Sequence, residues 1–174
     1  MSLFNQILSA IDNPEQEAST NQLGGILDTV QQLSDRSSGQ SPAIESAMSI
    51  VGNYTRSALR EQRSQRGEGQ VQQLINNFAG NGANAMAVNA LFNSSQVRSM
   101  ISQISSRTGL DARTIQAMLP ILVPLVLNML KTGRKTSNSS MGGNSVLNSF
   151  LDSDGDGDVD VADAMRMASR YLGR

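Results

Sequence analysis

The chain has 174 residues, of which 39% are hydrophobic and only 3% aromatic, and its net charge is −1. This length allows one compact domain or two small, closely packed halves, and the near-neutral charge creates no general attraction for nucleic acid or acidic lipid. The sequence contains no Cys and no His, which excludes disulfides, thiolate zinc sites, a cysteine nucleophile and a Ser-His-Asp triad. We therefore expect no enzymatic activity.

The first residues, MSLFNQILSAIDNPEQ, contain neither a basic region nor a small-residue cleavage site. A secretory signal is therefore not expected, and we predict a cytoplasmic protein.

Apolar residues recur at helical spacing along most of the chain, and no segment alternates as a strand does. The pattern predicts an all-α, compact multi-helix bundle. The first helices are expected near residues 3–11, 19–33 and 42–59, with a polar break over 63–69, followed by helices near 71–78 and 84–92. Ser94 or Ser95 should cap the next helix, which Gly109 should end.

The most apolar helix is predicted over residues 114–131, with Asp111 as its N-terminal cap. A membrane span needs about 20 consecutive apolar residues, whereas this run is shorter and is interrupted by Gln116, Pro120, Pro124 and Asn128. We therefore predict a helix buried on all sides by its neighbours, and no transmembrane segment. The two prolines should kink or break it.

The chain also resembles itself at a spacing of about 71 residues. VQQLSDR (30–36) is similar to ISQISSR (101–107), and the apolar positions of 44–59 match those of 115–130. We hypothesise two tandem helical repeats, whose long helices, residues 44–59 and the buried apolar helix 115–130, would pack together at the centre.

The sharpest chemical pattern is the acidic run 152–163, in which Asp residues occupy positions 1, 3, 5, 9 and 12 of a twelve-residue loop and Gly157 occupies position 6. This is the calcium-binding pattern of the EF-hand, with Asp in place of the usual Glu at position 12. Oxygen ligands at alternate positions can surround a hard divalent cation. The predicted metal ligands are Asp152, Asp154, Asp156, Asp158 through its backbone carbonyl, Asp160 and Asp163.

The shorter side chain of Asp163 makes two-oxygen ligation less secure, so we predict a calcium affinity of roughly 10⁻⁵ to 10⁻³ M, with magnesium as the alternative ion. An Asp/Gly-rich solvated turn that binds no ion is the alternative interpretation. The helices on either side should bury apolar stripes: Val146, Leu147, Phe150 and Leu151 before the loop, and Ala162, Met165, Ala168 and Leu172 after it.

These features divide the chain into three parts. Residues 1–131 are expected to form a helical bundle domain, and residues 132–144, rich in Ser, Gly and Asn, a flexible linker. Residues 145–174 should form a single C-terminal EF-hand-like helix-loop-helix packed on the bundle.

The run TGLD followed by LPILVPLVLNMLK, the opening MSLFNQIL and the acidic DGDGD near the C-terminus resemble the YidB-like bacterial proteins, a family of unknown function. The resemblance covers most of residues 23–172 and implies a compact all-helical fold. It implies no activity, substrate or catalytic residue.

The favoured function is a calcium-binding scaffold or binding module, in which the ion orders the C-terminal helix-loop-helix. The ordered segment either stabilises the fold or exposes Val146, Phe150, Met165 and Leu172 to a protein partner. EF-hands usually pair through position 8, so Val159 could join two copies in a homodimer. A static metal staple with no sensing role is the main alternative. Nucleic-acid binding is the least favoured alternative. It would depend on a basic run at a helix end: Arg56, Arg60, Arg63 and Arg66. No aromatic residues lie between them for base stacking, and a solvated helix end is the simpler interpretation.

Overall fold

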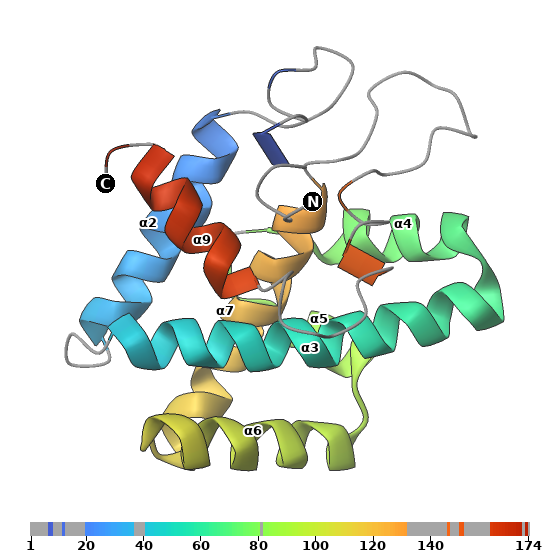
Figure 1. The fold of residues 1–174 in the computed structure, drawn as a ribbon. Helices are drawn as coiled ribbons and strands as arrows, with labels where there is room; N and C mark the ends of the chain where they lie inside the picture. The colour runs from blue at the N-terminus through green and yellow to red at the C-terminus, as the bar shows by residue number, and fades with distance from the viewer. Residues whose placement is uncertain are drawn as a thin grey trace.

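The computed structural model describes residues 7–8, 12, 20–36, 41–80, 82–131, 146, 150–151, 161–171 and 173, and of residues 20, 41 and 161–163 only the backbone. All regular elements in these ranges are helices, so the prediction of a compact all-α bundle is confirmed (Figure 1). The helices are α2 (Thr20–Arg36), α3 (Ser41–Arg66), α4 (Glu68–Phe78), α5 (Ala85–Leu91), α6 (Ser94–Thr108), α7 (Ala112–Lys131) and α9 (Val161–Tyr171).

The two longest of the described helices, α3 and α7, meet at the centre of the bundle. Helix α7 crosses behind α3 in Figure 1, and both contact α2, α4, α5 and α6. Residues along one face of α3, including Ile44, Met48 and Leu59, are fully buried against this centre. Burial of such apolar side chains is the main force that holds a helical bundle together.

Helix α7 is buried almost all round, as its composition predicts. Every residue from 122 to 130 is buried, including Pro124 and Asn128. The side-chain amide of Gln22 in α2 donates to the Asn128 Oδ1 at 2.9 Å and to its backbone carbonyl at 3.3 Å. A buried amide without such a partner would cost free energy, so this contact also ties α2 to α7.

The two prolines do not break α7. Because Pro124 has no amide hydrogen, the Pro120 carbonyl lacks its usual donor within the helix. The backbone amide of Asn84 supplies one at 2.7 Å, and the amide of Gly80 donates to the Pro124 carbonyl at 3.2 Å. The amide of Asn84, just before α5, therefore replaces the donor that Pro124 lacks, and the helix continues to Lys131.

Within the described residues, α7 is the one helix long and apolar enough to cross a membrane by length and composition. Its most apolar 18-residue stretch is 67% buried inside the protein, and the core helix of a globular domain has the same properties. The absence of a transmembrane segment stays a prediction.

Two predicted boundaries are wrong. Residues 63–66 belong to α3, and the only interruption before α4 is Gly67, whose φ of +87° few other residues adopt easily. Helix α6 is capped by Asn93 rather than by Ser94 or Ser95: the Asn93 side chain accepts from the Gln96 amide, and the Gln96 side chain accepts from the Asn93 amide, both at 2.9 Å.

Two predicted ends are confirmed. Gly109 closes α6 in the left-handed conformation, with φ of +73°. The Asp111 carboxylate caps the start of α7 by accepting from the Thr114 amide at 2.6 Å. The hydrogen bonds from the amide and the side chain of Thr114 hold the pKa of Asp111 below its ordinary value.

The helix order agrees with the hypothesis of two tandem repeats. Helices α2, α3 and α4 have counterparts in α6, α7 and the helical residues Val146, Phe150 and Leu151. The two long helices pack together, as a duplication requires. Duplication itself remains a hypothesis.

Candidate metal centre

The acidic loop itself lies largely outside the described residues. Asp163 is placed by its backbone alone, in the first turn of α9. No group of three or more acidic residues that could hold a metal ion is found in the part of the chain that the structure describes. The five other predicted ligands are outside it: Asp152, Asp154, Asp156, Asp158 and Asp160.

The residues just before the loop are held firmly in the core. Val146, Phe150 and Leu151 are helical and fully buried, which confirms three members of the predicted apolar stripe. Positions 146 and 150 are one helical turn apart, so both face the bundle. Leu151, the last described residue before the loop, is therefore part of the core.

Arg56 of α3 covers the Phe150 ring, with its guanidinium carbon 4.9 Å from the ring centroid. A cation at this distance from an aromatic face is attracted to it. Arg56 is only 8% exposed, so the prediction that the whole basic run is a solvated helix end is wrong at this position. Arg60 and Arg66 are exposed, as that prediction expects.

The residues just after the loop form α9, which packs on α2 and α3 (Figure 1). Ala164, Met165 and Ala168 are buried, so Met165 and Ala168 are confirmed as members of the predicted stripe; the Ala162 side chain and Leu172 lie outside the described residues. Arg166 forms an ion pair with Glu45 of α3, in which its Nη2 lies 2.6 Å and its Nε 2.8 Å from Oε2.

Both sides of the loop are thus attached to the same helix. Phe150 contacts Arg56, and Arg166 contacts Glu45. Residues 45 and 56 are eleven positions apart, or about 16 Å along α3 at 1.5 Å per residue. The described residues on either side of the acidic loop are therefore attached at separate points of one helix.

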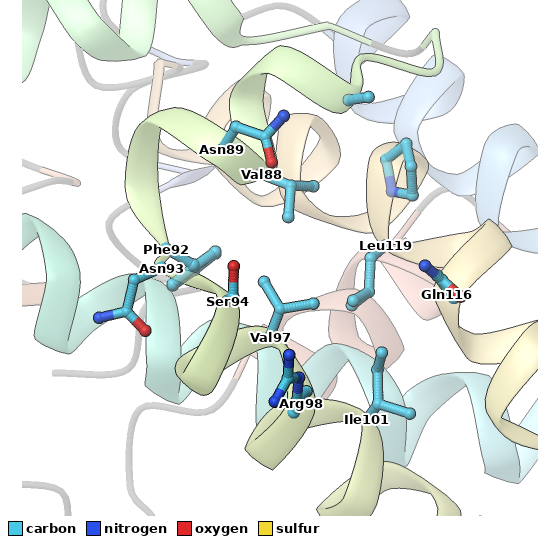
Figure 2. Close-up of a pocket in the computed structure, with 12 residues that line it drawn as sticks. Val88, Asn89, Phe92, Asn93, Ser94, Val97, Arg98, Ile101, Gln116 and Leu119 are labelled. Carbon is cyan, nitrogen blue, oxygen red and sulfur yellow. The ribbon is translucent and has the colours of Figure 1, made fainter.

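A second feature, which the sequence did not predict, is a cleft of about 770 Å³ between α5, α6 and α7 (Figure 2). Its floor is apolar, and one cation, Arg98, lies on its wall. The apolar pair Val97 and Ile101, which lies beside the buried pair Met100 and Ile104 on α6, is the only sequence signal that could have indicated it. Closure of the cleft depends on how α5 and α7 are placed, which local spacing does not determine.

Comparison with protein-family models, curated proteins and solved structures finds no match to this chain. The similarity to the YidB-like proteins therefore stays a prediction from the sequence motifs.

Proposed function

We propose that this chain is a calcium-binding helical module in which the ion closes the loop 152–163 and holds the C-terminal segment on the bundle. The spacing of the acidic residues is the observation that carries the proposal, because it provides an oxygen at each liganding position of a twelve-residue calcium loop. The attachment of both flanks to α3 supports it, since a loop with fixed ends loses less entropy when it closes around an ion.

The residues have distinct roles in this proposal. The carboxylates of Asp152, Asp154, Asp156, Asp160 and Asp163 would bind the ion, and Asp158 would contribute its backbone carbonyl. Without a cation these like charges repel one another, so ordering the loop is unfavourable. An ion that binds only the folded chain stabilises it by about 2.7 kcal/mol at one hundred times its Kd.

Because the residues on either side of the loop are buried, a structural metal site, the staple, is favoured over a calcium sensor. A calcium sensor exposes an apolar groove when the ion binds, and the side chains that could form one here include Val146, Phe150 and Met165. All three are buried in the bundle. Exposing them would remove apolar surface from the core, at a cost of about 25 cal/mol per Å². A binding module with a protein partner, or with a second copy through Val159, is the alternative.

Calorimetric titration with calcium tests the proposal. The wild-type chain should bind one calcium ion, and Asp152→Ala combined with Asp156→Ala should abolish binding. Glu61→Ala combined with Glu68→Ala is the matched control, because it removes two exposed carboxylates from the bundle and should leave calcium binding unchanged. Equal heats in the wild type and the Asp152/Asp156 variant would refute the proposal. A parallel magnesium titration compares the two ions.

Binding of a hydrophobic dye separates the staple from the sensor. The staple predicts that dye fluorescence stays constant or falls when calcium is added, since the C-terminal segment is held more tightly. A calcium-dependent rise would favour the sensor.

A further inference from the structure

Helices α5 and α6 both pack on α7 and enclose the cleft between them (Figure 2). The chain turns from α5 into α6 at Phe92 and Asn93, so this turn closes one end of the cleft, and Leu119 and Pro120 of α7 form a third wall. Its volume of about 770 Å³ lies in the range of small-molecule sites, roughly 300 to 1,000 Å³.

The apolar floor of the cleft is the edge of the bundle core, and Val97, Ile101 and Pro120 are its partly exposed residues. On α6, Met100 and Ile104 are fully buried among the core residues, whereas Val97 and Ile101 are only partly buried and line the cleft. A solvated helix face would ordinarily carry polar side chains here. The apolar lining is contributed by Val88, Phe92, Val97, Ile101, Leu119 and Pro120.

Among the residues that line the cleft, the charge is positive only. Arg98 is the only charged residue of the lining, and the remaining polar side chains are neutral amides and one hydroxyl: Asn89, Asn93, Gln116 and Ser94. Among the described residues no carboxylate pairs with Arg98, which is exposed on the cleft wall. An unpaired guanidinium beside an apolar floor complements a ligand that has a carboxylate at one end and a hydrocarbon chain at the other.

We propose that this cleft binds a single-chain amphiphile with an anionic head group, such as a medium- or long-chain carboxylate. The hydrocarbon chain lies on Val97, Ile101 and Pro120, and the head group accepts hydrogen bonds from Arg98. The site lies on α5–α7 and is independent of the acidic loop, so it is tested in calcium-free buffer.

Calorimetric titration with dodecanoate, below the concentration at which it forms micelles, measures this binding. One dodecanoate should bind per chain. Arg98→Gln should weaken binding about tenfold, as expected for loss of a charge-assisted hydrogen bond, and Val97→Gln should weaken it by a similar factor because it places an amide on the apolar floor. Arg107→Gln is the matched control: it removes an exposed arginine from the same helix but outside this cleft, and should change the affinity less than twofold.

Two further probes test the ligand class. Dodecyltrimethylammonium, which has the same chain and a cationic head, and acetate, which has the head without the chain, should both bind at least tenfold more weakly than dodecanoate. The proposal is overturned if dodecanoate does not bind, if the cationic amphiphile binds equally well, or if Arg107→Gln weakens binding as much as Arg98→Gln.

Vesicles of phosphatidylglycerol and phosphatidylcholine distinguish a free amphiphile from a lipid head group in a bilayer. The proposal expects no retention of the protein on these vesicles, and Arg98-dependent retention without dodecanoate binding would contradict it.

Circular dichroism of each variant verifies that helix content is unchanged. The Asp152/Asp156 variant should bind dodecanoate like the wild type, so failure of the calcium proposal and failure of this one give different results.

Discussion

Helices α6 and α9 lie on different sides of α3, and they are secured to it in different ways (Figure 1). Helix α6 carries its own end signals: an Asn93 capping box starts it, and Gly109 in the left-handed conformation ends it. Helix α9 follows the acidic loop and is attached to α3 by the ion pair between Arg166 and Glu45. Phe150, on the other side of the loop, contacts Arg56 of α3. Both contacts join residues far apart in sequence.

The difference shows which parts of the fold are specified locally. An end signal acts within four residues, so α6 can begin and end correctly wherever it packs. In α9, Arg166 pairs with Glu45, which is 121 residues earlier in the chain, so the position of this helix depends on a distant residue. We therefore expect α9, rather than α6, to respond to changes in the loop.

The largest effect is expected from Phe150→Ala. Loss of a fully buried aromatic ring costs about 3–5 kcal/mol of unfolding free energy, and here it also uncovers the buried Arg56 guanidinium. Met100→Ala on α6 should cost about 2–5 kcal/mol by the same reasoning. Urea unfolding of both variants compares the two sides of α3, and a loss below about 1 kcal/mol for Phe150→Ala would mean that the C-terminal segment is not part of the core.

A smaller effect is expected from Asn93→Ala, which removes the cap of α6. The free energy of unfolding should fall by about 1 kcal/mol, because the Gln96 amide loses its acceptor. Asn93→Ser is the control, since serine caps almost as well. Equal stability of the alanine and serine variants would show that the capping box contributes nothing measurable.

Arg166→Gln should have a smaller effect still. The Arg166–Glu45 ion pair is partly exposed, with side-chain exposures of 58% and 29%, and such pairs typically contribute about 0.2–1 kcal/mol. The difference from the wild type should shrink in 1 M salt, where the Debye length is about 3 Å. Arg170→Gln, at an exposed position of the same helix, should cost less; a larger loss would argue against the ion pair as an attachment of α9.

The smallest effect concerns the pH dependence contributed by Asp111 at the start of α7. Its pKa is lowered in the folded chain, so the carboxylate stabilises the fold above the pKa of the unfolded chain, and this contribution is lost as pH falls through the folded-state pKa. The stability difference between the wild type and Asp111→Asn should therefore narrow between about pH 4 and pH 2. A difference that stays constant over this interval would contradict the assignment.

Apolar spacing alone predicted the helical fold and the burial of α7, because both follow from periodicity and composition. The end of α6 and the start of α7 were predicted from single residues, because Gly109 and Asp111 act on their immediate neighbours in sequence. The start of α6 was misplaced because three successive residues, Asn93, Ser94 and Ser95, can each cap a helix, and only the reciprocal contact with Gln96 distinguishes them.

Features that depend on distant residues were not predicted. Arg56 has the spacing of an exposed basic face, yet it is buried and its guanidinium lies over the Phe150 ring. The prolines of α7 suggest a break, yet the amide of Asn84 satisfies the carbonyl that Pro124 leaves unpaired. The cleft around Arg98 likewise needs three helices in their final positions.

Hydrogen exchange of the α9 backbone amides, with and without calcium, tests the central proposal most directly, with α6 as the internal reference. If the ion closes the loop and holds α9 on α3, exchange in α9 should slow by up to about one hundredfold at calcium concentrations near one hundred times the Kd. Exchange in α6 that proceeds by local opening should not change. Identical α9 exchange rates in calcium and in chelator would contradict the account.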